Sequence, residues 1–253
     1  MMDPKEAAAG TRIAAYLARA GLGSRRSCEV LVQEGRITVN GKQITHPSQK
    51  VTASDIIMFD GEAIRPPEHT RVWRYHKPKG VICSRHDPQG RPTIFAQVEP
   101  IIGHCVSVGR LDFNTEGLML LTNNGAFARH LELPANGWIR RYRVRAYGPV
   151  TQAKLTSLAD GVKIDDINYG GINALIDSRQ GANLWVSVSI KEGKNREIRK
   201  IFAHLDCQVS RLIRTSYGAF QLGKLPEGTL EEIPAKMLRE QLGAQQAKDL
   251  GIP

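Results

Sequence analysis

The spacing of apolar and polar positions changes several times along the chain, and each spacing predicts a different element. Residues 11–20 place apolar side chains on one face of a helix, which Thr11 is expected to cap. Residues 24–35 predict a second helix, with a serine as its cap and a glycine at its end. The pair Asn40-Gly41, which lies between β-type residues, then predicts a tight hairpin.

Beyond residue 71, alternation with a period of two becomes frequent, which is typical of strands with one buried face. The segments "VWRYHKP" and "GVICS" predict strands, and "GLMLLT" predicts a buried strand. In "RRYRVRAYG", Tyr142 falls on the apolar face of a strand, and arginines occupy the other face. These arginines are Arg141, Arg143 and Arg145. The segment "NREIRKIFAHL" has the spacing of a helix. Strands and helices together predict an α+β fold with a central mixed, mainly antiparallel sheet.

A stretch with two prolines and several charges, "AIRPPEHTRV", separates the two patterns and predicts a semi-rigid linker. With 253 residues, the chain is long enough for two domains. We therefore expect a disordered N-terminus, a small α/β domain, a linker, a larger α+β domain and a polar tail that is frayed or helical. Their boundaries are residues 1–10, 11–60, 61–71, 72–235 and 236–253.

The formal net charge of +10 favours an anionic partner, because basic side chains release counterions when they bind phosphates. A generally basic protein without such a partner is the alternative. The clustering of the charge favours nucleic acid. Residues 11–50 hold seven Lys or Arg against two acids, and "IRRYRVR" holds four arginines and no acid.

Other features of the sequence narrow the class of protein. No apolar run reaches the roughly 18 residues of a membrane helix, and the N-terminus lacks the apolar core of a signal peptide. We therefore expect a cytoplasmic protein that contacts no membrane. The four cysteines form no CxxC pair, the histidines are scattered, and no glycine-rich phosphate-binding motif is present. Neither a metal nor a small-molecule cofactor is expected.

The stretch "GRLDFNTEGLMLLTNNG" places a carboxylate, Asp112, shortly before the predicted buried strand. Asp, Asn and Thr all form local hydrogen bonds to the backbone, so a structural Asx turn is one interpretation. A catalytic carboxylate is the other, because loops that rigid strands hold in place often carry catalytic groups. The residue pattern alone leaves both interpretations open.

Two further residues share this ambiguity. Tyr142, on the core-facing side of its strand, is either a hydrogen-bonded core tyrosine or a phenol that reaches a site. Arg199 borders the apolar stripe of its helix. It is either a solvated cation or a half-buried one that needs a carboxylate partner.

The segment "RIAAYLARAGLGSRRSCEVLVQEGRITVNGKQI" resembles the S-four RNA-binding domain over nearly its whole length. In that family the start of the second helix faces RNA. The resemblance therefore implies that Arg25 and Arg26, which occupy this position, contact RNA. A small basic unit without RNA contact is the alternative.

Later segments resemble, in order, the motifs of the RsuA/RluB family of pseudouridine synthases. They are "YHKPKGVICSRHDPQGRPTIF", "GRLDFNTEGLMLLTNNG", "RRYRVR", "KEGKNREIRKIF" and "VSRLIRTSYG". With the S-four-like segment, the resemblance covers roughly residues 11–235. It implies the pseudouridine synthase fold and the isomerisation of uridine in RNA to pseudouridine.

The same resemblance implies a role for each site residue. Asp112 matches the catalytic carboxylate, Tyr142 the tyrosine that stacks on the target base, and Arg199 the basic residue that pairs with the aspartate. Leu212 matches an apolar residue that packs against the base site. A uridine inside a helix must flip out to react, and Arg110 matches the position proposed to fill the vacated space.

The combination of an S-four-like domain with this catalytic type implies ribosomal RNA as the partner of a monomeric enzyme. "SRHDPQGRPTIF" and "EGKNREIRK" resemble the large-subunit branch of the family more than the small-subunit branch. The alternatives are a synthase that acts on small-subunit rRNA or tRNA, a non-catalytic RNA-binding ribosome-assembly factor, and an RNA glycosidase that releases free base.

Overall fold

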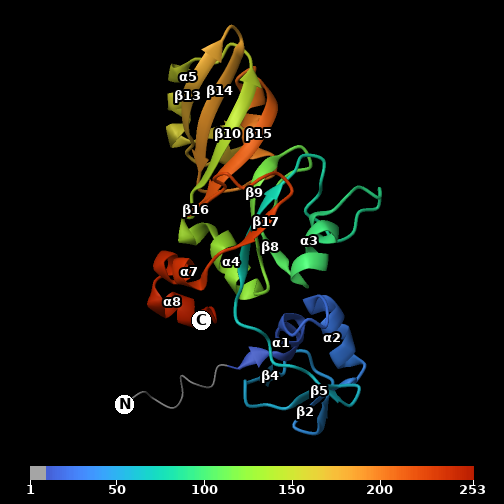
Figure 1. The fold of residues 1–253 in the computed structure, drawn as a ribbon. Coiled ribbons are helices and arrows are strands. Elements are labelled where there is room, and N and C mark those ends of the chain that lie inside the picture. Colours follow the sequence, from blue (N-terminus) through green and yellow to red (C-terminus); the bar gives the residue numbers. More distant parts are fainter. Residues whose placement is uncertain (1–9) are drawn as a thin grey trace. The chain divides into compact units, whose positions relative to one another are not determined.

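The computed structural model describes residues 10–253. Nearly all of the expected disordered N-terminus, residues 1–10, lies outside the described residues. The chain divides into two compact units, one that ends at Thr70 and one that runs from Arg71 to Pro253 (Figure 1). No helix in the described part of the chain is long and apolar enough to cross a membrane.

The N-terminal unit packs two helices and short strands around one apolar core. Ile13 and Leu17 are fully buried there, which confirms the apolar face predicted for the first helix. Four strands form a sheet in the order β3-β2-β5-β6, and β1 pairs with β4. The elements are β1 (Thr11–Arg12), α1 (Ile13–Arg19), α2 (Arg25–Gln33), β2 (Ile37–Val39), β3 (Lys42–Ile44), β4 (Lys50–Val51), β5 (Ile57–Phe59) and β6 (Glu62–Ala63).

Local sequence signals account for most of this unit. Ser24 caps α2 by accepting a hydrogen bond from the Ser27 amide at 3.1 Å, as predicted. Asn40 and Gly41 both have positive φ, as the predicted tight hairpin between β2 and β3 requires. Thr11 does not cap α1, because its backbone is paired in the β1-β4 ladder and α1 begins two residues later, with Arg12 at its N-cap position.

The second unit is built on a nine-stranded sheet that is mixed but mainly antiparallel, which confirms the predicted fold class (Figure 1). The strand order is β13-β14-β10-β15-β9-β7-β17, with β8 paired to β9 and β16 to β15. Its strands are β7 (Val72–Lys77), β8 (Val106–Val108), β9 (Glu116–Thr122), β10 (Arg140–Tyr147), β13 (Asn173–Gln180), β14 (Asn183–Ile190), β15 (Gln208–Tyr217), β16 (Phe220–Gln221) and β17 (Leu230–Glu232).

The remaining elements of this unit lie outside the large sheet. β11 (Val162–Ile164) and β12 (Ile167–Tyr169) form a separate two-stranded sheet. The α-helices are α3 (Ile94–Ile102), α4 (Gly125–Glu132), α5 (Gln152–Thr156), α6 (Glu197–His204), α7 (Ala235–Leu242) and α8 (Ala244–Asp249). Two short 3-10 helices, η2 (Pro134–Asn136) and η3 (Ser157–Asp160), follow α4 and α5.

Alternation along the strands separates two apolar cores. In β9, Met119 and Leu121 belong to the larger core, to which α3, α5 and α6 contribute. Leu118 and Leu120 belong to a second core, to which α4, α7 and α8 contribute. Every residue of β9 is buried, whereas β10 alternates strictly between buried and exposed residues. The predicted buried strand and the predicted alternation in "RRYRVRAY" are both confirmed.

Gly117 marks the point where β9 and β15 pair in parallel. Its φ is +107°, and a Cβ atom there would lie 2.3 Å from the backbone oxygen of Arg214. Only glycine permits both this φ and this approach. The contact joins the strand that follows Asp112 to the strand that carries Leu212.

The expected tail, residues 236–253, is helical, which is one of its two expected alternatives, but α7, α8 and the residues after them also bury apolar side chains in the second core. Two other expectations are wrong. Residues 62–63 of the expected linker form β6, which pairs with β5. The segment "GVICS" is not a strand, since Ile82 makes a single isolated bridge and the rest is irregular.

Candidate active site

Asp112 lies between β8 and β9, on a loop of residues 109–115 that we call the Asp112 loop. Hydrogen bonds to backbone oxygens hold this loop. The Cys83 thiol donates to the carbonyl of the residue before Asp112 at 3.2 Å. The Gly80 amide donates to the carbonyl of the residue after it at 2.8 Å. Both donors belong to the irregular segment that follows β7.

Two cations bind further carbonyls of the loop. Lys77, which is fully buried at the end of β7, donates from Nζ to the backbone oxygens of Asp112 at 3.3 Å and Thr115 at 2.9 Å. Arg199 on α6 donates from Nη2 to the backbone oxygen of Asn114 at 2.7 Å. The five consecutive carbonyls around Asp112 are thus all bonded to donors that the fold supplies.

The carboxylate of Asp112 takes no part in this bonding. The turn is closed through the backbone, because the Thr115 amide donates to the carbonyl oxygen of Asp112 at 3.0 Å. Within residues 10–253, the carboxylate accepts no hydrogen bond, and Oδ2 lies 3.9 Å from Nη1 of Arg196. An Asx turn uses the side-chain oxygen as its acceptor. That interpretation of Asp112 is therefore wrong.

The structure places Arg199 differently from the ion pair that the resemblance implies. Arg199 donates to the backbone oxygens of Asn114 and Val209, at 2.7 and 2.9 Å. Its buried Nε has no hydrogen-bond partner in the described part of the chain. Burial lowers the pKa of Arg199, the charge of Arg196 lowers it further, and Asp112 acts in the opposite direction. Arg199 therefore braces the loop backbone, and Arg196 is the cation beside the carboxylate.

A cavity of about 570 Å³ opens at the Asp112 loop, a volume in the range of small-molecule sites. Four residues singled out in the sequence line it together: Arg110, Asp112, Tyr142 and Leu212. Tyr142 and Leu212 come from the neighbouring strands β10 and β15 and are buried, whereas Arg110 is exposed. Arg199 is not among the lining residues.

Arg25 and Arg26 belong to the N-terminal unit. They occupy the first turn of α2, where both side chains are exposed, as expected. Arg25 lies 3.5 Å from Glu29, one helical turn further on, in an exposed ion pair. Such a pair contributes little to stability and leaves the charges available to an anionic ligand.

The sequence patterns did not single out Lys77 and Arg196. The available signal for Lys77 is its register, because it follows Trp73 and Tyr75 at a period of two on the core-facing side of β7. A cation in that row needs buried acceptors. Arg196 has a left-handed φ of +52° at the N-cap of α6. No pattern in the sequence distinguishes it from the basic residues around it.

Two carboxyl groups, Glu192 and Glu197, line the same cavity. Glu197 is 3% exposed, and one of its oxygens accepts from the Lys194 amide at 2.9 Å. Glu192 accepts from the Gly170 amide at 2.7 Å and from the ammonium of Lys194. Burial, followed by the neighbouring Glu192 carboxyl, raises the pKa of Glu197 to about 7. This residue therefore carries a proton under conditions in which an ordinary glutamate is ionised.

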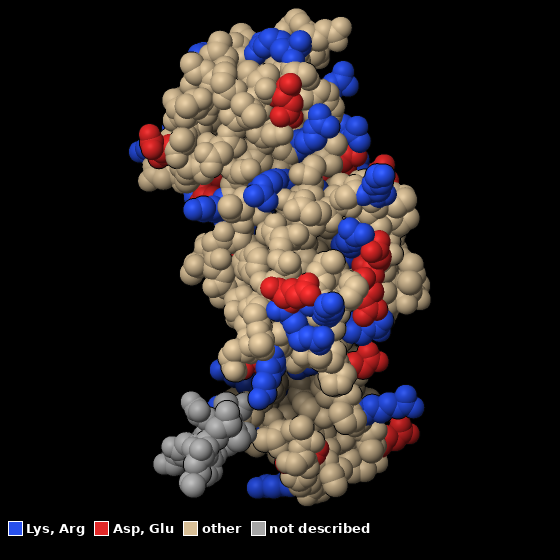
Figure 2. All heavy atoms as spheres, turned by 60° about the vertical axis from the view of Figure 1, so that its left-hand side comes forward, with Lys and Arg blue, Asp and Glu red and all other residues tan. Residues whose placement is uncertain are grey.

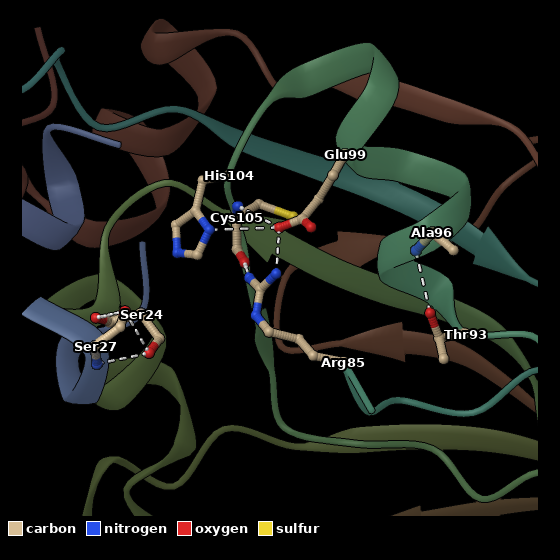
Figure 3. A network of polar contacts seen from close by, with 8 residues as sticks. All are labelled: Ser24, Ser27, Arg85, Thr93, Ala96, Glu99, His104 and Cys105. Atoms are coloured by element: carbon tan, nitrogen blue, oxygen red, sulfur yellow. Dashed lines mark hydrogen bonds and ion pairs between the residues drawn. The ribbon is translucent and has the colours of Figure 1, made fainter. Parts of the chain in front are cut away.

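A polar network fixes the chain just before β8 (Figure 3). Arg85 donates to Glu99 on α3 at 2.5 Å and also to the backbone oxygen of Cys105. His104 lies 3.5 Å from the same Glu99 oxygen. Because β8 leads directly into the Asp112 loop, this network holds the loop at its N-terminal end.

Fold and site together define a class of protein. A mixed sheet carries a cavity with a free carboxylate, a tyrosine, an apolar side chain and arginines, and a small basic α/β unit precedes it. This is the arrangement expected of an RNA pseudouridine synthase. A family model described as RNA pseudouridylate synthase matches residues 71–204, and one described as S4 domain matches residues 11–57. The chain belongs to the RNA pseudouridylate synthase family, in its RsuA/RluB branch, and carries an N-terminal S4 (S-four) domain.

Known proteins are similar over most of the chain. A ribosomal large subunit pseudouridine synthase B of Pasteurella multocida is 41% identical over 244 residues, which cover 92% of this chain and 71% of that protein. An uncharacterized RNA pseudouridine synthase of Rickettsia prowazekii is 40% identical over 233 residues, 91% of this chain and 97% of that protein. A crystal structure of a pseudouridylate synthase gives a TM-score of 0.64 at 25% identity, with 91% of this chain and 98% of that chain covered. The predicted enzyme class, an isomerase that forms pseudouridine, is confirmed.

Proposed function

We propose that this enzyme isomerises one specific uridine in large-subunit ribosomal RNA, with Asp112 as its catalytic carboxylate. The observation that carries the proposal is a carboxylate that accepts no hydrogen bond within residues 10–253, on a loop where the five backbone carbonyls of residues 111–115 all accept one. A structural aspartate would use its carboxylate to hold the loop. Here other groups donate to these five carbonyls, and the carboxylate lies beside Arg196 at the cavity.

The chemistry needs such a group. The bond between C1′ of ribose and N1 of uracil breaks, and a bond between C1′ and C5 forms. C5 loses a proton and N1 gains one, so the composition of the RNA is unchanged. Positive character develops at C1′ as the first bond breaks, and a carboxylate can stabilise it, attack or accept a proton. Each of these roles needs a carboxylate that can reach the ribose, and the carboxylate of Asp112 lines the cavity and accepts no hydrogen bond within residues 10–253.

The other cavity residues take complementary roles in this proposal. Tyr142 and Leu212 contact the flipped base from two neighbouring strands. Arg110, which is exposed, fills the space that the base leaves. Arg196 places a positive charge 3.9 Å from the carboxylate of Asp112, and Arg199 holds the backbone of the loop through Asn114.

The choice of RNA rests on the relatives and on the S4 domain. Proteins named ribosomal large subunit pseudouridine synthase B from Pasteurella multocida, Yersinia pestis and Salmonella typhi are 40% or 41% identical to this chain. We extend their printed substrate to this enzyme, with Arg25 and Arg26 of the S4 domain in contact with the RNA. Action on ribosomal RNA also implies a cytoplasmic location.

Mapping of pseudouridines tests this function. Carbodiimide modification followed by primer extension on rRNA from a deletion strain should show the loss of one stop in large-subunit rRNA. Expression of the wild-type chain should restore it. A stop lost only from small-subunit rRNA or from tRNA would contradict the substrate choice. A complete set of stops in the deletion strain would contradict the function itself.

A further inference from the structure

The positive charge of the chain is not a uniform field, since Figure 2 shows Lys and Arg beside Asp and Glu over one face of the molecule. A surface with several arginines and few acids is therefore informative. The outer side of β10, β14 and β15 is such a surface, and these strands lie side by side in Figure 1. We call it the arginine face; its residues are Arg141, Arg143, Arg145, Tyr147, Trp185 and Arg211.

The arginine face lies on the opposite side of the sheet from the cavity. Tyr142, which lines the cavity, alternates along β10 with the arginines of this face. Leu212 follows Arg211 in the same way on β15. Three of the four arginines of β10, Arg141, Arg143 and Arg145, are exposed and recur about every 6.8 Å, the spacing of alternate residues in a strand. The described cavity therefore does not use them.

Two of the arginines have acidic partners. Arg143 lies 3.8 Å from Asp177 and stacks on the ring of Trp185, at 4.7 Å from its centroid. Arg211 donates to both carboxylate oxygens of Glu116, at 2.6 and 3.1 Å. These contacts hold the two side chains in place on the face.

Arg141 and Arg145 lack such partners. In the part of the chain that the structure describes, neither forms an ion pair, and the only side-chain hydrogen bond of Arg141 is a long one of 3.5 Å to the Ser216 hydroxyl. Arg145 also stands directly opposite Arg211 in the pairing of β10 with β15. Like charges in directly opposite positions destabilise a sheet; Glu116 offsets the charge of Arg211, whereas no acid among residues 10–253 pairs with Arg145.

RNA is the anion that fits this surface best. Phosphates repeat at regular intervals along a nucleic-acid backbone, and the guanidinium groups also repeat along β10. Tyr147, at the end of the same row, is 57% exposed and offers a ring on which an unpaired base can stack. The substrate of this family is itself an RNA, so the ligand is present whenever the enzyme acts.

We propose that the arginine face is a second RNA-binding surface, which binds the phosphate backbone of the substrate RNA outside the segment that enters the cavity. Backbone contacts carry no sequence information, so this surface adds affinity and leaves the choice of uridine to the cavity and the S4 domain. This inference rests on the proposed function in one respect: large-subunit rRNA is chosen as the RNA for the binding test.

The test is a salt series of filter-binding measurements with the full-length chain and an in vitro transcript of large-subunit rRNA. The double variant Arg141→Gln/Arg145→Gln removes the two arginines that have no acidic partner. Each lost phosphate contact reduces the slope of log K against log salt by ~0.7–0.9, so the slope should fall in magnitude by ~1.4–1.8. The charge-preserving variant Arg141→Lys/Arg145→Lys should keep the wild-type slope.

A control removes two charges from the other side of the same sheet. Lys154 and Lys163 are exposed on α5 and β11, which pack on the core side, and Lys163 forms an exposed ion pair with Asp166 at 2.8 Å; Lys154→Gln/Lys163→Gln should leave the slope unchanged. An unchanged slope in Arg141→Gln/Arg145→Gln would overturn the inference. An equal loss in the Lys154 and Lys163 control would also overturn it, as would a wild-type protein that does not bind the transcript. A wild-type protein that binds the transcript but forms no pseudouridine in it would count against the proposed function alone.

Discussion

At the scale of single residues, the carboxylate of Asp112 accepts no hydrogen bond from the loop that carries it or from the rest of residues 10–253. Backbone carbonyls near a core must be hydrogen-bonded, and in most loops nearby polar side chains meet part of that need. In the Asp112 loop, Lys77, Cys83 and Arg199 meet it instead. The carboxylate therefore does not stabilise the loop, although it lies in a turn-prone stretch where aspartate side chains often hydrogen-bond to the backbone.

The two arginines near Asp112 should respond differently to substitution. Arg196→Ala removes the cation beside a carboxylate from a half-exposed position, so kcat should fall roughly tenfold to a hundredfold with little change in stability. Arg199→Ala leaves two backbone oxygens without donors and should lower the free energy of unfolding by ~1–3 kcal/mol as well as the rate. Single-turnover rates and urea unfolding of both variants separate an effect on the rate from an effect on stability. Arg196→Lys is the charge-preserving control. A fully active Arg196→Ala variant would contradict the assignment.

Glu197 gives the enzyme a predictable dependence on pH. A carboxyl whose pKa is raised in the folded state contributes a stability that is present below its unfolded value and is lost as pH rises through the folded one. Wild-type stability should therefore carry a component that declines between about pH 4.5 and 7. Glu197→Gln keeps an acceptor for the Lys194 amide and removes this component.

The expected result is that Glu197→Gln is more stable than the wild type at pH 8, by roughly 1–3 kcal/mol, and equal to it near pH 4. Urea unfolding at several pH values measures the difference between the two proteins. The exposed substitution Glu240→Gln is the control and should show no trend with pH. If the difference in stability between Glu197→Gln and wild type stays constant from pH 4 to 8, the pKa of Glu197 is not raised in the folded state.

Part of the site could be predicted from the sequence. Tyr142 and Leu212 were placed by strand alternation and motif order, and they do line one cavity with Asp112. The partner of Asp112 could not be predicted. Which of two arginines three residues apart reaches the carboxylate depends on the left-handed turn at Arg196, and this turn leaves no trace in hydrophobic periodicity.

At the scale of elements, the Asp112 loop depends on the strand beside it. Lys77 at the end of β7 binds three backbone oxygens and has its pKa lowered by burial. Lys77→Met should leave at least two of these oxygens unpaired and lower the free energy of unfolding by ~2–4 kcal/mol, with a fall in kcat from a looser loop. Lys79→Met, an exposed position two residues later, is the control. Equal stability of the two variants in urea would show that Lys77 does not support the loop.

Strongly periodic elements were predictable, and elements that depend on tertiary packing were not. The fully apolar β9 and the alternating β10 carry their pattern in their own residues. Helices α7 and α8 are short and mostly polar, and each is helical because a few side chains such as Leu238 complete the second core. Thr11 is a good cap by residue type, yet pairing with β4 determines its backbone.

At the scale of the whole molecule, two units with different tasks are joined in one chain. The S4 unit carries Arg25 and Arg26 on its surface, and the synthase unit carries the chemistry. Arg25→Glu/Arg26→Glu should weaken RNA binding and reduce its salt dependence, by a slope change of ~1.4–1.8 or more, because two phosphate contacts become repulsions. A filter-binding salt series tests this, with Arg25→Lys/Arg26→Lys as the control. Wild-type affinity in the charge-reversed variant would show that this helix does not contact RNA.

We propose that Asp112 carries the chemistry and does not support the fold. The most direct test is pseudouridine formation by Asp112→Asn on the large-subunit rRNA transcript under single-turnover conditions, with RNA affinity and urea unfolding measured on the same preparation. We expect no pseudouridine above the enzyme-free background, with affinity and stability close to those of the wild type, because the carboxylate makes no hydrogen bond within residues 10–253. Appreciable pseudouridine formation by a clean preparation of this variant would contradict it.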